Sequence, residues 1–294
     1  MRSLILAAAV GVFSASSVMA DATVYALGTD NILRVFQAST PGTIAATIPV
    51  TGLANGESLI GIDTRALNGD LVGVGSGSSI YKIDKVTGAA TVIGTPGTLA
   101  LSGAEAGIDF NPTVDRIRYV DAGAGNRRFN PVTGGVAAND AALTYSNNAA
   151  TPRAVGVAYT NSKLGGVPAG SVREYIIDSG IDALGEVGSQ AGGNASFNAG
   201  VTAVVGTGLG VDTNDLVGFD IDGNTGVAYL SLTDPISNLS SFYTLNLATG
   251  SANLVGAIDV SVQGATIRDI TVVPEPTAMA GLGLAAMLGL RRRK

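Results

Sequence analysis

The chain has 294 residues, of which 46% are hydrophobic and 14% charged, and it contains no cysteine, histidine or tryptophan. These absences exclude imidazole general bases, Ser-His-Asp triads, thiol nucleophiles and His/Cys zinc sites. Five of the 17 basic residues lie in the two ends, which leaves 12 basic against 23 acidic residues over 21–276, a net charge of −11 that argues against nucleic-acid binding.

The first 20 residues predict a secretory signal peptide. Arg2 precedes an apolar run over residues 4–13, which is too short to span a membrane, and small residues lead to Ala20. We expect cleavage between Ala20 and Asp21 after passage through the secretion translocon of the inner membrane. A buried N-terminal helix is the alternative interpretation.

The body, residues 21–273, predicts an all-β fold. Apolar residues alternate with period two, and 41 glycines indicate many tight turns. One hairpin unit recurs at 80–88 and 242–250: a strand ends on Asp84 or Asn246, whose side chain can bond its own turn, and Gly88 or Gly250 starts the return strand. Residues 128–134, 175–178 and 34–42 predict three further copies of this unit.

A second recurring unit gives the period. Gly61-Ile62-Asp63 is matched at 107–109, 156–158 and 218–220. Ile62 and Ile108 are 46 residues apart, and Tyr81 and Tyr175 are 94 apart, twice 47, so the period is roughly 46 to 48 residues. A Gly- and Asn-rich insertion at about 188–214 lengthens the last interval. Four strands in such a period are typical of propeller blades. We predict a β-propeller of five four-stranded blades, closed by pairing of the N-terminal strand at 24–27 with the last strand at 267–272.

The body resembles the bacterial family catalogued as domain of unknown function 4394. The resemblance covers most of residues 21–273 and is carried by the segments 107–112, 115–118, 125–131 and 158–161. It implies a secreted, propeller-like domain with no established activity.

Three acidic residues occupy equivalent repeat positions: Asp63, Asp109 and Asp220. A propeller could gather these carboxylates around its axis, where one protonated acid and one ionised partner could cleave a glycan without histidine. The alternative is that each aspartate caps an equivalent turn.

Asp220, Asp222 and Asn224 alternate like the start of a calcium loop. The glycine comes one place late, and Ser231 stands at position twelve in place of Glu, so a plain hairpin turn is the preferred interpretation. We expect no other cofactor.

Four arginines form the densest basic cluster: Arg116, Arg118, Arg127 and Arg128. Their guanidinium groups could hold a carboxylated ligand or an acidic polysaccharide. We expect instead that they pair internally with Asp109, Asp115 and Asp121.

Residues 274–294 predict a sorting signal. Val273, Pro274, Glu275 and Pro276 form the motif, an apolar segment follows at 277–290, and Arg291, Arg292, Arg293 and Lys294 close the sequence. This order resembles the PEP-CTERM signal of Gram-negative bacteria, which implies recognition and processing by an exosortase after transient insertion in the inner membrane. An ordinary C-terminal transmembrane anchor is the alternative.

The expected function is that of an exported, noncatalytic propeller module at the cell surface or in the extracellular matrix. Its expected partners are the translocon, the exosortase and an exopolysaccharide or surface protein. The competing hypothesis is a carboxylate-dependent propeller that cleaves or binds glycans.

Overall fold

The computed structural model describes residues 21–102, 105–189, 191–259 and 266–273. The predicted signal peptide and the sorting motif beyond Val273 lie outside these residues. Within them, no helix has the length and apolar character needed to span a bilayer.

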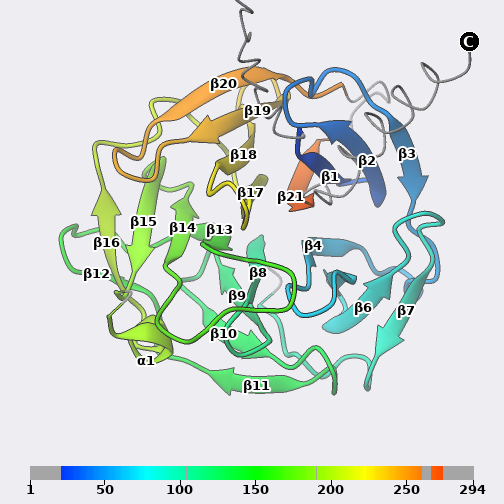
Figure 1. Ribbon diagram of the computed structural model, residues 1–294, viewed down its shortest axis with the longest axis horizontal. Helices are drawn as coiled ribbons and strands as arrows, with labels where there is room; N and C mark the ends of the chain where they lie inside the picture. The colour runs from blue at the N-terminus through cyan, green and yellow to red at the C-terminus, as the bar shows by residue number, and fades with distance from the viewer. Residues whose placement is uncertain (1–20, 103–104, 190, 260–265, 274–294) are drawn as a thin grey trace, which may run out of the picture.

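Five antiparallel sheets surround one axis, so the domain is a five-bladed β-propeller, as predicted (Figure 1). The innermost strands, one per blade, are β21 (Ile267–Val273), β4 (Leu59–Thr64), β8 (Ala106–Asn111), β13 (Ala154–Tyr159) and β17 (Val217–Ile221). Each inner strand packs against the inner strands of the two neighbouring blades.

The remaining strands follow outward from the axis. Blade 1 adds β1 (Thr23–Gly28), β2 (Ile32–Gln37) and β3 (Ala46–Pro49), and blade 2 adds β5 (Leu71–Gly75), β6 (Ser79–Ile83) and β7 (Ala90–Ile93). Blade 3 adds β9 (Arg116–Asp121), β10 (Asn126–Phe129) and β11 (Val136–Asn139). Blade 4 adds β14 (Glu174–Asp178), β15 (Ala183–Val187), β16 (Val201–Val205) and, parallel to β16, β12 (Thr144–Tyr145). Blade 5 adds β18 (Ala228–Thr233), β19 (Ser240–Leu245) and β20 (Ala252–Ala257).

Blade 1 closes the ring with strands from both ends of the body. β21 pairs antiparallel with β1, in a register that runs from Thr23 opposite Val273 to Leu27 opposite Asp269. The predicted closure is confirmed. The start of β1 and the end of β21 therefore lie beside each other on the same face of the propeller.

The core consists of apolar clusters that lie between blades. Five of the six clusters of buried side chains in the described residues each draw on two neighbouring blades, so every blade boundary has one. Val155 and Phe219, for example, belong to the cluster between blades 4 and 5. Because each blade completes its core only against its neighbours, stability depends on the closed ring.

The predicted hairpin turns form as expected. The Asp84 carboxylate accepts the backbone N–H groups of Val86 and Thr87 at 2.9 and 2.8 Å, and Gly88 has a φ of 74°. Asn130 and Asn246 accept the equivalent N–H groups in their own turns.

One copy of the hairpin unit was wrongly placed. Residues 175–178 form β14, the second strand of blade 4, whereas the other copies lie in third strands such as β6 and β19. A long loop at 160–173 separates β13 from β14 and displaces the repeat, so the spacing from Tyr81 to Tyr175 is coincidental. The predicted insertion at 188–214 also contains regular structure, the short helix α1 (Gly193–Asn198) and β16.

Glycines allow the inner strands to approach each other closely. A Cβ atom on Gly107 would lie 2.6 Å from the Cα of Gly156, and one on Gly218 would lie 2.5 Å from the backbone nitrogen of Ile270. Gly61 and Gly156 occupy the same position in their strands. The fifth inner strand has Asp269 there, and its carboxylate fills the space beside Gly61.

Candidate functional site at the propeller axis

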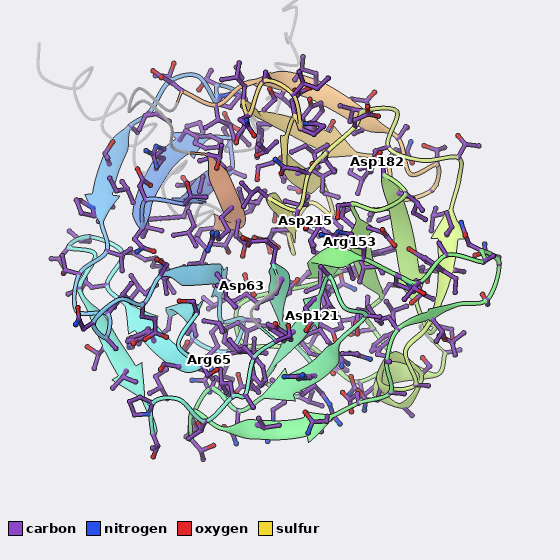
Figure 2. All side chains as sticks on the ribbon, turned by 180° about the vertical axis from the view of Figure 1, so that it is seen from behind. Asp63, Arg65, Asp121, Arg153, Asp182 and Asp215 are labelled. Atoms are coloured by element: carbon purple, nitrogen blue, oxygen red, sulfur yellow. The ribbon has the colours of Figure 1, made fainter. Side chains whose placement is uncertain are left out.

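The inner strands bring Asp63, Asp109 and Asp220 together at the axis. All three are buried, with 5%, 2% and 5% of their surface exposed, and the Asp109 carboxyl interacts electrostatically with the other two. Figure 2 shows Asp63 near the centre of the ring. The predicted convergence is therefore what the structure shows, while the catalytic role stays a prediction.

Each axial carboxyl binds the backbone of the next blade. Asp63 Oδ2 accepts the N–H of Phe110 at 2.7 Å, and Asp109 Oδ2 accepts the N–H of Tyr159 at 2.6 Å. In the same way Asp220 Oδ2 accepts the N–H of Val272 at 2.5 Å. These bonds join neighbouring blades, so the aspartates do more than cap turns within their own blades.

Two residues of β21 belong to the same arrangement and were missed by sequence reasoning. Thr271 stands at the aspartate position of blade 1, and its Oγ1 accepts the N–H of Thr64 at 3.1 Å. Asp269, at the glycine position, accepts the N–H of Ile62 at 2.8 Å. Alignment of 268–272 with the repeat that contains Asp63 would have found both. Blade 4 has Ala158 at the aspartate position, so it makes no side-chain hydrogen bond to the backbone of the next blade there.

Burial raises the pKa of Asp63 and raises the pKa of Asp109, Asp220 and Asp269 well above the usual range. The negative charge of Asp63 raises the pKa of Asp109 further. Among the described residues no donor binds the buried Asp109 Oδ1, and the Asp109 carboxyl faces that of Asp63. A proton held between Asp63 and Asp109 would give this oxygen a partner.

A pocket of about 390 Å³ opens at the mouth of the axis, on the face where the inner strands end. Asp63 and Asp220 form part of its wall, and Lys85, Ser162 and Val273 also line it. Its size falls within the range of small-molecule sites.

The β13–β14 loop shapes this face. In Figure 1 it passes in front of the inner strands towards the turn after β4, where the Gly165 N–H donates to the Ala66 carbonyl at 2.8 Å. Val167 N–H likewise donates to the Pro112 carbonyl in the turn after β8. The loop separates the axial pocket from a second depression of about 430 Å³ between these turns.

The calcium candidates form a hairpin turn. Asp222 Oδ1 accepts the N–H of Asn224 at 2.8 Å, and Oδ2 accepts the Thr225 hydroxyl at 2.7 Å. Asp220 accepts two backbone N–H groups, those of Ile221 and Val272. In the part of the chain that the structure describes, no three acidic side chains are grouped to hold a metal ion.

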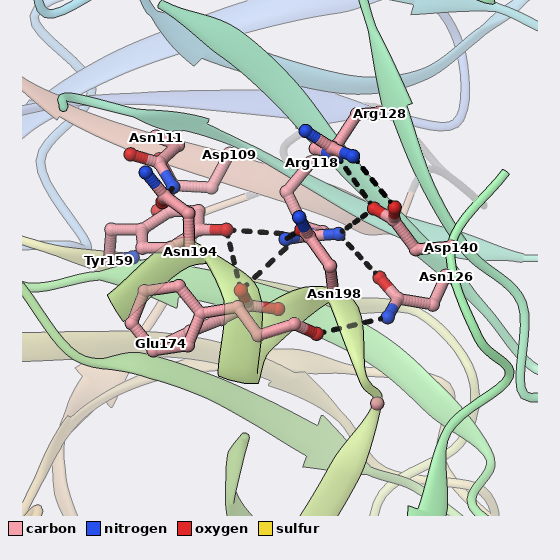
Figure 3. A network of polar contacts seen from close by, with 12 residues as sticks. Asp109, Asn111, Arg118, Asn126, Arg128, Asp140, Tyr159, Glu174, Asn194 and Asn198 are labelled. Atoms are coloured by element: carbon pink, nitrogen blue, oxygen red, sulfur yellow. Dashed lines mark hydrogen bonds and ion pairs between the residues drawn. The ribbon is translucent and has the colours of Figure 1, made fainter. Parts of the chain in front are cut away.

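The arginine cluster pairs internally, but with other partners than expected (Figure 3). Arg118, only 1% exposed, lies within 2.8 Å of Asp140 and 3.3 Å of Glu174. Arg128 also binds Asp140. The network further includes Tyr159, whose hydroxyl donates to Glu174 at 2.5 Å, and the Asn126 and Asn198 side chains, which bind Arg118.

The other expected pairings do not form. Asp115 binds Arg65 of blade 2, Asp121 accepts backbone N–H groups of its own turn, and Arg127 donates to the Ala100 carbonyl. Arg116 bonds backbone carbonyls of its own turn. Sequence reasoning missed Asp140 and Glu174, because these partners come from the end of blade 3 and from blade 4.

These features define a five-bladed β-propeller whose repeated motif residues join neighbouring blades. The chain belongs to the family described as "Domain of unknown function (DUF4394)", whose model matches residues 32–271. No curated protein matches the chain.

Several solved structures share a distant likeness. One from Bacteroides uniformis, provisionally described as a 6-phosphogluconolactonase, is 13% identical with a TM-score of 0.39, over 86% of this chain and 71% of that chain. A Lactobacillus plantarum protein is 15% identical with a TM-score of 0.40, over 84% and 70%. A chain of a nidogen/laminin complex is 12% identical with a TM-score of 0.37, over 61% and 59%. Likenesses at this level carry no functional conclusion.

Proposed function

We propose that this protein is an exported, noncatalytic interaction module that binds its partner at the axial pocket. The observation that carries the proposal is that the axial carboxyl groups are already hydrogen-bonded within the protein. Asp63 and Asp220 engage both oxygens with protein donors, so the pocket wall offers no free acid and base pair. The pocket itself is open, and polar side chains such as Lys85, Ser162 and Asn224 are among those that line it.

We propose further that the PEP-CTERM-like tail directs the protein through an exosortase to the cell surface or extracellular matrix. The support is the order of motif, apolar segment and basic residues in the sequence. Mass spectrometry of the extracellular protein should show a mature start near Asp21 and loss of the residues beyond the Pro274 region. Mature protein that retains Lys294 would refute the sorting proposal.

A glycan-cleaving enzyme is the second candidate, because Asp63 and Asp220 face an open pocket. An assay of polysaccharide hydrolysis distinguishes the two candidate functions. It compares the wild-type protein with the Asp109→Asn and Asp220→Asn variants. We expect no hydrolysis by any of them. Hydrolysis by the wild type that either variant loses would establish the enzyme instead.

We propose that the domain needs no calcium. Among the described residues, the hydrogen-bond donors to the Asp222 carboxylate all belong to its own turn, so the hairpin is complete without a metal. Calcium added to chelator-treated protein should leave the melting temperature unchanged, and a clear rise would indicate a site at Asp220, Asp222 and Asn224.

A further inference from the structure

The mouth of the axial pocket gathers polar side chains from three blades. Lys85 comes from the β6–β7 turn of blade 2, Ser162 from the β13–β14 loop of blade 4 and Asn224 from the β17–β18 turn of blade 5. All three line the same cavity of about 390 Å³. One ligand in this cavity can therefore meet a cation, a hydroxyl and an amide.

Two glycines bring these segments into contact. Lys85 Nζ donates to the Gly69 carbonyl at 2.9 Å, and a Cβ atom on Gly69 would lie 3.5 Å from the Leu164 side chain. A Cβ atom on Gly223 would lie 2.3 Å from the Ser162 carbonyl oxygen, so the β17–β18 turn packs against the β13–β14 loop. The cation thus lies next to an apolar side chain, and the hydroxyl lies next to the turn that carries the amide.

The cation is available to a ligand. The bond from Lys85 to Gly69 leaves two N–H groups of the ammonium for another acceptor. Among the described residues no carboxylate forms an ion pair with Lys85, whereas Arg65, the other cation that lines the pocket, is bound by Asp115. A single ammonium matches a carboxylate, with one negative charge, better than a phosphate group, which carries about two.

The remaining groups of the mouth fit a hydroxylated ring. Within the part of the chain that the structure describes, the side chains of Ser162 and Asn224 make no hydrogen bond, so both can bind hydroxyl groups of a ligand. Leu164, which is 75% exposed, offers an apolar surface to ring C–H groups. A ligand with only a carboxylate, or with only hydroxyls, would leave part of this set without a partner.

We propose that the axial pocket binds a uronic acid residue of an acidic polysaccharide. The sugar carboxylate pairs with the Lys85 ammonium, its hydroxyls bind Ser162 and Asn224, and one face of its ring contacts Leu164. This inference rests on the proposed function, because it names the class of partner that the same pocket takes.

Ligand-observed NMR on the full chain in mild detergent tests the class of ligand. The probes are methyl glucuronide, methyl glucoside and the phosphate ester of methyl glucoside, which share one ring and differ in its charged group. We expect the glucuronide to bind about tenfold more tightly than the neutral glucoside, and more tightly than the phosphate ester. No binding of the glucuronide, equal binding of the glucoside, or tightest binding of the phosphate ester would each overturn the inference.

Variants assign the contacts within the pocket. Lys85→Gln should bind the glucuronide no better than the glucoside, because it removes the positive charge alone. Lys82→Gln, which breaks an exposed ion pair with Asp70, is the matched control and should keep the tenfold preference. Ser162→Leu and Asn224→Leu should each weaken both sugars by about fivefold, since both sugars use the hydroxyl contacts. A preference that survives Lys85→Gln would contradict the assigned ion pair.

Retention of labelled protein on the cells that produce it separates this inference from the proposed function. We expect the double variant Ser162→Leu, Asn224→Leu and the variant Lys85→Gln both to be retained less than the wild type. Equal retention of the double variant and the wild type, or retention of neither, would refute binding at the axial pocket itself. Loss by the double variant with full retention of Lys85→Gln would overturn only the acidic-sugar inference.

Discussion

At the scale of single residues, the raised pKa of Asp109 beside Asp63 predicts a pH dependence of stability. The folded state raises the pKa of Asp109 well above that of the unfolded chain, which is about 3.9. The folded state thus binds the proton more tightly, so its stability is fully present at low pH and is lost as pH rises towards the folded pKa. Each unit of pKa difference corresponds to about 1.4 kcal/mol.

The Asp109→Asn variant should lose this pH dependence, since an amide can donate to Asp63 and still accept from Tyr159 without titrating. Urea unfolding at pH 5 and at pH 9 measures the free energy of unfolding of both proteins at each pH. We expect the wild type to lose more stability than the variant between these values. Parallel losses would show that no proton is held between Asp63 and Asp109.

The buried network around Arg118 predicts a large effect of one substitution. Arg118→Met removes the cation that faces Glu174 and Asp140, and uncompensated buried charges cost about 3–5 kcal/mol of unfolding free energy. The matched control is Arg173→Met, which breaks an exposed pair with Glu186 and should cost about 0–1 kcal/mol. Similar losses in urea unfolding would mean that the Arg118 network contributes little.

At the scale of strands, the glycines between inner strands predict a steric effect. A methyl group in Gly107→Ala meets backbone atoms of β13, which cannot rotate away, and we expect a loss of about 1–3 kcal/mol. Gly135→Ala is the control, because its nearest neighbour would be 3.9 Å away and its φ is not positive. Equal free energies of unfolding for the two variants would show that blades 3 and 4 can move apart without a loss of stability.

The strand pattern was predictable where local chemistry determines it. Asp84 and Gly88 specify their turn through neighbouring atoms, so the hairpins, the blade count and the closure by β21 followed from the sequence. The axial position of Asp63 followed from its place in the repeat. What was missed depends on contacts between blades: the partners of Arg118 lie 22 and 56 residues away, and the β13–β14 loop changed the spacing that placed Tyr175.

At the scale of the whole molecule, the clusters between blades predict that the ring folds as one unit. A chain ending at residue 266 lacks β21 and leaves blade 1 without its inner strand, so blades 1, 2 and 5 lose packing at the axis. We expect no cooperative unfolding transition by circular dichroism. A chain ending at Val273 is the control and should unfold cooperatively; the same transition in both would show that closure is dispensable.

The neighbouring ends of β1 and β21 also determine how the protein responds to force. Because Thr23 and Val273 are the terminal pair of an antiparallel ladder, opposite pulls on the two ends would separate its hydrogen bonds one after another, as in a zipper. A pull on a single end has no opposing attachment point and puts no tension across this ladder. A molecule held to a surface by one end alone would thus be mechanically robust, whereas one stretched between its two ends would open first at blade 1.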